Sequence, residues 1–383
     1  MAGCGIYVND RTWTYHKRTM MSRRICMICQ SLNVGGIERA MSTLANYFVT
    51  RDCEVYFLTI YSYPKIFKLD NRITLYENPN LYSKKGIVGF YLKTFGPIKG
   101  WLPHKVDEIH PDVVMSFGDY MPHMAMISLK GKYPFYYANR SNPMISYSLP
   151  FELIRSYAYK YYPPAGIIAQ TQLAKKRKEK IFGDKLPRIV VIPNPARQVK
   201  HDGEERKNQI ISVGRVWWSK GFGRVIDAFA KLKAPDWQLV LVGDGPAMNE
   251  MKEYVAGKGI AERVVFTGKT NNVDHFLREA KIYAMGSYKE GFPNALCEGM
   301  AAGLAPVSFD IIAGPSDIID SGKNGFLVKD DDIDAMAERI QYLIDNPIEL
   351  ERIASEASKI TAKFSLEKIG NRYYNFIWGI DNE

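Results

Sequence analysis

Short apolar runs alternate with longer amphipathic stretches along most of the chain. Runs rich in valine and isoleucine and bounded by polar residues predict buried strands. The stretch 37–49 has apolar residues at helical spacing and predicts the first helix. The expected strands of the first half are 25–29, 54–60, 111–117, 135–138, 166–169 and 189–192. Strands and helices in this order favour a parallel sheet covered by helices.

A second series of the same kind follows a polar, charged stretch at 199–208, which we interpret as a linker. The expected strands of the second half are 209–213, 237–242, 264–266, 282–285 and 305–308, and its clearest helices are 223–233 and 248–257. The pattern therefore predicts an α/β protein with two doubly wound halves. Ligands of such sheets bind at the carboxyl ends of the strands, so we expect the site in a cleft between the halves.

The composition agrees with a folded two-domain chain, since 46% of the 383 residues are hydrophobic and 24% are charged. The net charge of +10 suits an anionic partner. No zinc-finger or RNP-type signature is present, so nucleic acid is not expected, and the basic run 175–180 is typical of a solvated helix face. The stretch 84–105 mixes aromatic residues with lysines and has no acidic residue; it fits an anionic membrane surface or an ordinary amphipathic helix equally well.

The cysteines indicate a reducing compartment, since they are five in number and loosely spaced. Cys26 and Cys29 match C-x-x-C, but they lie in an expected strand, where this spacing puts them on opposite faces. We interpret them as buried hydrophobic residues. No run of ~18 apolar residues predicts a membrane span, and the polar first twenty residues do not resemble a secretory signal.

Two glycine-containing loops follow expected strands. Gly35 and Gly36 precede the first helix, where a backbone without side chains allows close approach of an anionic ligand to the helix N-terminus. The loop does not match G-x-G-x-x-G, so a nicotinamide cofactor is not indicated. In the second half, Gly214 is followed by Arg215 and Lys220, a fork and a point charge that can converge on one diphosphate.

The stretch 290–298 reads EGFPNALCE and comes just after an apolar strand. Pro293 suits the first turn of a helix, so a helix is expected to begin near 292–294 and to continue through Met300. Glu290 would then lie in the loop and Glu298 more than one turn inside the helix. A phosphate can bind the free amides of the first turn while a carboxylate on either side accepts hydrogen bonds from hydroxyl groups. Further on, 313–319 predicts a glycine-rich turn and a helix, and 322–328 a turn into a short strand.

Together these motifs resemble glycosyltransferase family 4, whose members are retaining, nucleotide-sugar-dependent enzymes of the GT-B fold. The resemblance covers nearly the whole chain from about residue 24, and its most specific parts are the two glutamates, G-R-x-x-x-x-K, the early Gly-Gly and the G-P-S-D-I-I…G-x-N-G-F-L-V run. It implies an irregular extension over 1–22, an acceptor-side Rossmann-like domain over 23–198, the linker 199–208, a nucleotide-sugar-binding domain over 209–365 and a C-terminal helix within 366–383 that packs back on the first domain.

The resemblance also implies roles for individual residues. Arg215 and Lys220 would clamp the donor diphosphate, Glu298 would accept hydrogen bonds from the ribose, and Glu290 would hold hydroxyls of the donor sugar. Lys269 and Thr270 would lie near the base. The remaining donor-binding residues would be Gly35, Gly36, Gly214, Gly291, Phe292, Pro293, Asn294, Ala295 and Leu296.

One position departs from the family pattern, in which many members have a cleft histidine in the first domain. Asn139 and Arg140 stand where that histidine is expected, and Asp119, after the strand 113–117, is another candidate. We interpret His123 as structural. The first-domain catalytic residue is thus Asn139, Arg140 or Asp119.

The resemblance implies retention of configuration, with a phosphate oxygen taking the acceptor proton and with no metal or other cofactor. The expected donor is a UDP-sugar carrying a hexose or N-acetylhexosamine, and the expected acceptor is a saccharide, lipid-linked, used in bacterial capsule or lipopolysaccharide assembly at the inner face of the cytoplasmic membrane. Two alternatives stay open: a non-catalytic nucleotide-sugar-binding partner and a nucleotide-sugar 2-epimerase. A glycosidase pair of carboxylates is rejected, because it leaves Arg215 and Lys220 unexplained.

Overall fold

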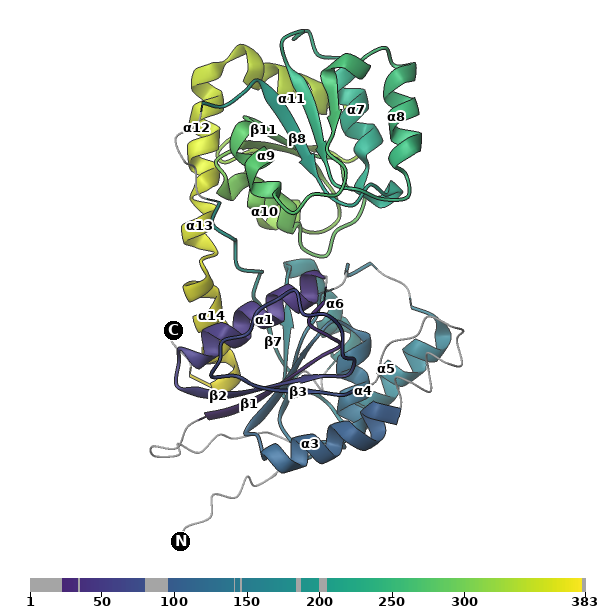
Figure 1. Cartoon of the computed structure of the whole chain (residues 1–383), viewed down its shortest axis with the longest axis vertical. Helices are drawn as coiled ribbons and strands as arrows, with labels where there is room; N and C mark the ends of the chain where they lie inside the picture. The colour runs from purple at the N-terminus through teal and green to yellow at the C-terminus, as the bar shows by residue number, and fades with distance from the viewer. Residues whose placement is uncertain are drawn as a thin grey trace. The chain divides into compact units, whose positions relative to one another are not determined.

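The computed structural model describes residues 23–33, 35–79, 96–140, 142–144, 147–183, 187–199 and 205–380. The chain forms two compact units (Figure 1). The first contains the described residues up to Pro193 together with those from Leu366 onwards, and the second extends from Asn194 to Ser365. Part of the stretch expected to be a linker, 200–204, lies outside the described residues.

The first unit contains a seven-stranded parallel sheet in the order β3-β2-β1-β4-β5-β6-β7. The strand order reverses between β1 and β4, which pair from Ile25↔Val113 to Ile28↔Ser116. Loops that leave the carboxyl ends of these two strands diverge and open a crevice at this switch point. The strands are β1 (Arg23–Cys29), β2 (Cys53–Thr59), β3 (Thr74–Glu77), β4 (Val113–Phe117), β5 (Phe135–Ala138), β6 (Gly166–Ala169) and β7 (Arg188–Val191).

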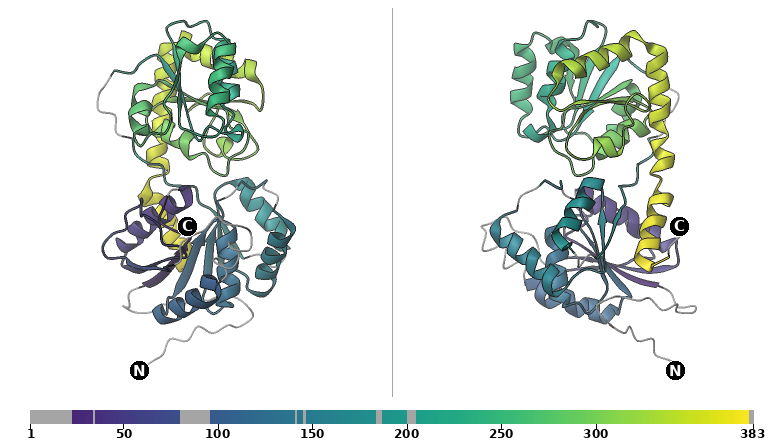
Figure 2. Two further views of the ribbon diagram at one scale, coloured as in Figure 1. Left: turned by 45° about the vertical axis from the view of Figure 1, so that its right-hand side comes forward. Right: turned by 180° about the vertical axis from the view of Figure 1, so that it is seen from behind.

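Helices cover both faces of this sheet (Figures 1 and 2). They are α1 (Gly36–Val49), α3 (Leu102–Ile109), α4 (Tyr120–Leu129), α5 (Leu149–Tyr161), α6 (Gln172–Phe182) and α14 (Leu366–Trp378). The C-terminal helix α14 packs against α1, and the Tyr47 hydroxyl and Asn371 Oδ1 are 2.7 Å apart. The residues from 97 to 109 form a short π-helical turn followed by α3, and their apolar positions Ile98, Leu102 and Val106 are fully buried.

The second unit repeats the same topology with six parallel strands in the order β10-β9-β8-β11-β12-β13. Its order reverses between β8 (Gln209–Val213) and β11 (Ile282–Met285), so the switch point lies at their carboxyl ends. The other strands are β9 (Gln238–Val242), β10 (Val264–Phe266), β12 (Ala305–Asp310) and β13 (Phe326–Lys329).

The helices of the second unit form two layers. The helix α7 packs beside α8 and α11, whereas α10 packs beside α12 and α13. Their bounds are α7 (Phe222–Ala230), α8 (Met248–Gly257), α9 (Val273–Glu279), α10 (Asn294–Ala301), α11 (Ile333–Asp345), α12 (Pro347–Ser358) and α13 (Ile360–Lys363). With the first unit, this confirms the two doubly wound α/β halves that the sequence predicts.

Local predictions hold where the apolar pattern is strong. All eleven expected strands are present within about two residues of their predicted ends. The helix expected within 313–319 is wrong: the segment contains a single 3₁₀ turn, Pro315–Asp317, because Gly314 enters it with φ +108° and the chain turns again before β13. Cys26 and Cys29 are buried free thiols, as predicted, and burial raises the pKa of Cys29 to about 12.

Only part of the stretch 84–105, for which the sequence left membrane contact open, lies among the described residues. Residues 80–95 lie outside them, and from 97 onwards the apolar face is buried, which agrees with an ordinary amphipathic helix; contact of the basic residues with a membrane stays a prediction. Within the described residues, none of the helices combines the length and the apolar character that crossing a bilayer requires.

Candidate functional site

Two loops meet at the switch point of the second unit. One follows β8 and contains Gly214, Arg215 and Lys220; the other follows β11 and leads to Glu290. They emerge side by side because β8 and β11 are hydrogen-bonded neighbours, with Ile210 opposite Ile282. The sheet order therefore brings together two motifs that lie about 70 residues apart in the sequence.

The two loops are in direct backbone contact. A Cβ atom placed on Gly221 would lie 2.0 Å from the carbonyl oxygen of Gly286, and one on Gly286 would lie 2.2 Å from the carbonyl oxygen of Gly221. Gly221 also has a φ of +58°, which glycine adopts without steric cost. The amide of Tyr288 donates to the carbonyl of Ser219 at 2.9 Å. Only glycine at both positions lets the loops approach this closely.

The contact brings Lys220 against Glu290. The Lys220 ammonium donates to Glu290 Oε1 at 2.7 Å, and the Ser287 hydroxyl donates to the same oxygen at 2.7 Å. The side chain of Lys220 is 32% exposed and that of Glu290 13%. A cation and a fixed carboxylate thus lie next to each other at the carboxyl ends of the strands. This pairing was not predicted, although both residues were expected in one site.

Arg224, on the first turns of α7, holds the second loop from behind. Its Nε and Nη2 donate to the carbonyl of Gly286 at 2.8 and 2.5 Å, and Nη2 also donates to the carbonyl of Ser287 at 2.7 Å. Its Nη1 donates to Asp330 at 2.7 Å. The guanidinium is 4% exposed and lies between two aromatic rings, 3.9 Å from the centre of Tyr288 and 4.1 Å from that of Phe309. Sequence reasoning missed Arg224, since it lies on a helix face that shows only as an amphipathic pattern.

The helix α10 begins where the sequence predicts it, with Pro293 as its N-cap residue. Glu298, on its second turn, forms an ion pair with Arg197 at 3.6 Å, and Arg197 also pairs with Asp274 at the start of α9. The side chain of Asn194 donates to Asn294 Oδ1 at 2.7 Å. Each glutamate of the EGFPNALCE stretch therefore has its own cation, Lys220 for Glu290 and Arg197 for Glu298. Arg197 was also missed by sequence reasoning, because it lies in a loop outside the motifs.

The turn before α10 explains the G-P-S-D segment. A Cβ atom on Gly314 would lie 2.7 Å from Cδ of Pro293, so this segment packs directly against the start of α10. The side chains of Phe292 and Leu296 are buried, which leaves their backbone as the part able to meet a ligand. Gly291 and Ala295 are half-buried, and Asn294 is exposed.

The other residues predicted for this site lie near it with varied exposure. Arg215 is exposed, and Gly214 passes close to the aliphatic part of Lys220, because a Cβ on Gly214 would lie 3.6 Å from Lys220 Cδ. Lys269 is exposed, and the Thr270 hydroxyl accepts the amide of Asn272 at 3.0 Å in the turn before α9. Their ligand roles stay predictions.

The switch point of the first unit contains a pocket of about 470 Å³. It lies where β1 and β4 end and where α1, α4 and α5 begin, and it is lined by carboxylates and aromatic rings that include Glu38, Phe117, Asp119, Tyr120, Tyr147 and Phe151. Gly36 opens α1 next to it, and the carbonyl of Gly35 accepts the amide of Arg39 at 3.1 Å.

The three first-domain candidates have different surroundings. Asp119 lines the pocket and is 8% exposed, and the side-chain amide of Asn139, itself 4% exposed, donates to Asp119 Oδ1. Arg140 instead lies 4.2 Å over the ring of Phe117 and donates to the hydroxyl of Tyr373 at 2.8 Å on α14. Of the three, only Asp119 is among the described residues that line the pocket.

His123 is fully buried behind this pocket, in an aromatic cluster with Tyr137, Phe151 and Tyr159. Its Nδ1 lies within hydrogen-bonding distance of the carbonyl of Asp119. Burial lowers the pKa of His123 to about 3, so the imidazole is neutral near pH 7. A neutral ring packed among aromatic residues is consistent with the structural interpretation.

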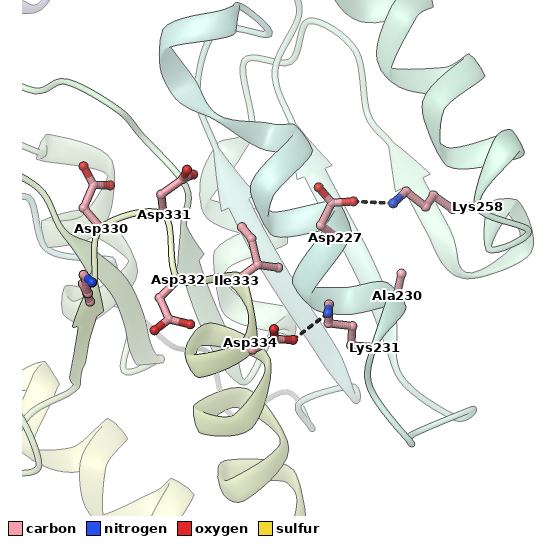
Figure 3. A pocket seen from close by; sticks show the side chains of 10 residues that line it. Asp227, Ala230, Lys231, Lys258, Asp330, Asp331, Asp332, Ile333 and Asp334 are labelled. Atoms are coloured by element: carbon pink, nitrogen blue, oxygen red, sulfur yellow. Dashed lines mark hydrogen bonds and ion pairs between the residues drawn. The ribbon is translucent and has the colours of Figure 1, made fainter.

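A larger pocket of about 640 Å³ lies elsewhere in the second unit (Figure 3). It is lined by five aspartates and three lysines, with ion pairs joining Asp227 to Lys258 at 2.7 Å and Lys231 to Asp334 at 2.5 Å. Its excess of carboxylates opposes an anionic ligand, so its size does not make it a diphosphate site. Among the described residues, no group of three or more histidine, cysteine, aspartate or glutamate side chains is arranged to hold a metal ion.

Comparison with known proteins agrees with this geometry. Residues 195–360 match the family model for glycosyl transferases group 1. A Haemophilus influenzae protein described as an uncharacterized glycosyltransferase is 27% identical over 351 residues, which cover 88% of this chain and 94% of the relative. From Campylobacter jejuni, the GalNAc-alpha-(1->4)-GalNAc-alpha-(1->3)-diNAcBac-PP-undecaprenol alpha-1,4-N-acetyl-D-galactosaminyltransferase is 24% identical over 374 residues, which cover 94% of this chain and 99% of that enzyme.

Solved structures show the same fold. The structure of Anabaena Alr3699/HepE in complex with UDP superimposes with a TM-score of 0.76 at 18% identity, covering 93% of this chain and 100% of that protein. The fold is therefore GT-B, with two Rossmann-like domains, as predicted. Together with the group 1 match and the relatives, it supports a glycosyltransferase of bacterial glycan biosynthesis.

Proposed function

We propose that the protein is a retaining glycosyltransferase of family 4 that moves a hexose or N-acetylhexosamine from a UDP-sugar to a saccharide acceptor. The observation that carries this proposal is the Lys220–Glu290 pair at the switch point of the domain that matches the group 1 model. UDP as the nucleotide is supported by the similar Anabaena structure, which contains UDP. A lipid-linked acceptor is supported by the Campylobacter relative, whose name specifies a diphospho-undecaprenol glycan.

The geometry suits departure of a nucleoside diphosphate. As the bond from the anomeric carbon to the phosphate oxygen breaks, negative charge develops on the diphosphate, and the Lys220 ammonium and the exposed Arg215 would stabilise it. Glu290 holds Lys220 in place and would accept hydrogen bonds from hydroxyls of the donor sugar. Glu298, with its charge balanced by Arg197, would accept those of the ribose. Retention follows if the acceptor attacks the face from which the diphosphate leaves, with a phosphate oxygen taking the acceptor proton.

Thermal-shift binding tests the donor site. At about 100 times its Kd, UDP should stabilise the wild type by about 2.7 kcal/mol, which corresponds to a rise in Tm of several degrees for a unit of this size. Lys220→Ala and Glu298→Ala should abolish the rise, whereas Lys231→Ala, a lysine of the same unit paired with Asp334, should keep it. If no nucleotide shifts the wild type, the transferase proposal is refuted; the UDP-sugar with the largest shift identifies the donor.

We also propose that transfer needs no divalent metal, because fixed cations can stabilise the leaving group. We expect an excess of EDTA to leave the initial rate of transfer unchanged, since no metal-bridged diphosphate is involved. The measurement compares initial rates with and without EDTA, and after adding back magnesium or manganese. Loss of activity that either metal restores would contradict the proposal.

A further inference from the structure

The donor chemistry proposed above uses residues of the second unit and none of those that line the pocket of the first unit. It lies wholly within that unit, at the carboxyl ends of β1 and β4, and its volume of about 470 Å³ is within the range of small-molecule sites. Figure 1 shows α1, α4 and α5, which supply its walls, around this end of the sheet.

One wall of the pocket is aromatic. The rings of Tyr120 and Phe151 stack with centroids 5.7 Å apart and planes 28° from parallel, and Tyr147 lies 4.4 Å from Phe151. An aromatic face carries partial negative charge and attracts weakly positive C–H groups. The C–H face of a pyranose ring is such a partner, so this wall suits a sugar.

A sugar also needs hydrogen-bond acceptors for its hydroxyl groups, and Asp119 supplies them. One of its carboxylate oxygens accepts from Asn139, and the other, Oδ2, is buried and has no hydrogen-bond partner among the residues that the structure describes. Asp119 is also the N-cap residue of α4, yet its side chain makes no capping hydrogen bond. A buried carboxylate oxygen without a partner is costly, and a ligand hydroxyl would satisfy it.

The charges around the pocket select against anions. Glu38 is a second carboxylate in the lining, and neither lysine nor arginine is among the described lining residues. Three cations lie near the lining residues without being among them: Arg140 is 4.2 Å over the ring of Phe117, Arg155 is 5.6 Å over the ring of Tyr147 while it pairs with Glu152, and Lys178 approaches the Tyr159 hydroxyl at 3.5 Å. A phosphate, uronate or sialate in the pocket would face carboxylates without a direct counter-charge.

From this combination we infer that the pocket binds the terminal sugar of the acceptor and that this sugar is uncharged. The inference rests on the proposed function, because it assigns the acceptor of that reaction. Asp119 would accept a hydrogen bond from an acceptor hydroxyl, the aromatic wall would stack on the ring, and Asn139 acts as a positioning residue that orients Asp119. An acceptor ending in an acidic sugar would be excluded by charge.

Saturation-transfer NMR on the full chain tests this inference without donor chemistry. The probes are millimolar methyl glycosides of galactose, glucose, N-acetylgalactosamine and N-acetylglucosamine, with methyl glucuronide and glucose 6-phosphate as anionic counterparts. At least one neutral glycoside should show saturation transfer, and both anions should show little. Asp119→Asn should weaken the bound neutral glycoside by about tenfold, the usual worth of a charge-assisted hydrogen bond.

Two further variants separate binding from folding. Tyr147→Ala removes a half-buried ring and its stacking area, so it should lower the affinity for every neutral glycoside that binds. Asp52→Asn is the matched control, because Asp52 is exposed and has a φ of 55° that asparagine also adopts. This variant should leave the saturation transfer to every glycoside unchanged. All variants should keep the UDP-induced thermal shift, which reports a correctly folded donor domain.

The outcomes distinguish the two proposals. If UDP shifts the wild type but no neutral glycoside shows saturation transfer, or if the anions bind as well as the neutral sugars, the pocket inference is overturned and the donor assignment stands. Equal binding by wild type, Asp119→Asn and Tyr147→Ala also overturns it. If a neutral glycoside binds and both variants weaken it while UDP has no effect, the pocket is supported as a sugar site and the transferase proposal fails.

Discussion

Replacing Lys220 with methionine is expected to lower kcat for sugar transfer by about 100- to 1,000-fold, the usual cost of removing one group that stabilises developing charge. Methionine keeps most of the length of the side chain but removes the ammonium that lies 2.7 Å from Glu290 at the carboxyl ends of β8 and β11. The effect should fall on kcat more than on KM, because charge on the diphosphate grows as the bond breaks. Steady-state kinetics with the UDP-sugar chosen by the thermal-shift panel measures both.

The control for this variant is Lys231→Met. Lys231 lies in the same unit, pairs with Asp334 and is half-exposed, so its loss should leave kcat within about twofold of wild type, as expected for a surface pair. Lys220 and Glu290 also form a pair, so Glu290→Gln and the double variant complete a mutant cycle. A kcat for Lys220→Met near that of wild type would remove Lys220 from the reaction and leave it as a partner of Glu290.

The second large effect is expected at Arg224. Arg224→Met should lower the free energy of unfolding of the second unit by about 3 kcal/mol, because it leaves the buried carbonyls of Gly286 and Ser287 without their charged donor. The free energy of unfolding of Arg224→Lys should lie between those of wild type and Arg224→Met. An ammonium lacks the planar fork of the guanidinium, which reaches both carbonyls and lies between the rings of Tyr288 and Phe309. Urea unfolding followed separately for the two units measures the change.

Hydrogen exchange distinguishes local from global effects of Arg224→Met. In Arg224→Met, the exchange rates of the amides of 286–290 should rise more, relative to wild type, than those of the β8–β9 ladder, because the guanidinium holds this loop specifically. Arg339→Met is the control: Arg339 is exposed on α11 and lies over the ring of Phe326, and its loss should cost less than about 1 kcal/mol. If Arg224→Met and Arg339→Met lower the free energy of unfolding by the same amount, Arg224 does not hold this loop in place.

The sequence predicts the architecture well and places the loops 214–221 and 286–290 after the correct strands, because both depend on apolar runs and on glycine, proline and charged residues at strand ends. The weak edge strand β3 was missed, since its residues Thr74–Glu77 are exposed or half-buried and lack a buried apolar run. The helix α4 was missed for a different reason: it is apolar almost all round, and its burial leaves little amphipathic period to detect.

The partners of the site residues were beyond sequence reasoning. Arg224 and Arg197 lie on a helix face and in a loop, and their contacts with Gly286 and Glu298 depend on packing between elements far apart in the chain. Asn139 and Asp119 were both candidates, but only the structure, in which β4 pairs with β5, shows that the Asn139 side chain donates to Asp119. Such contacts depend on strand order and register, which local patterns do not encode.

The close approach of Gly221 and Gly286 couples the loops 214–221 and 286–290 into a single structural unit. Each carbonyl occupies the space that a side chain on the other loop would need, so a residue other than glycine at 221 or 286 would not fit unless the other loop changes with it. An effort to alter the donor sugar by exchanging loops should therefore treat 214–221 and 286–290 as one part, with Arg224 as its anchor. Drift in donor preference among related chains would then appear as paired substitutions in two segments that look independent in the sequence.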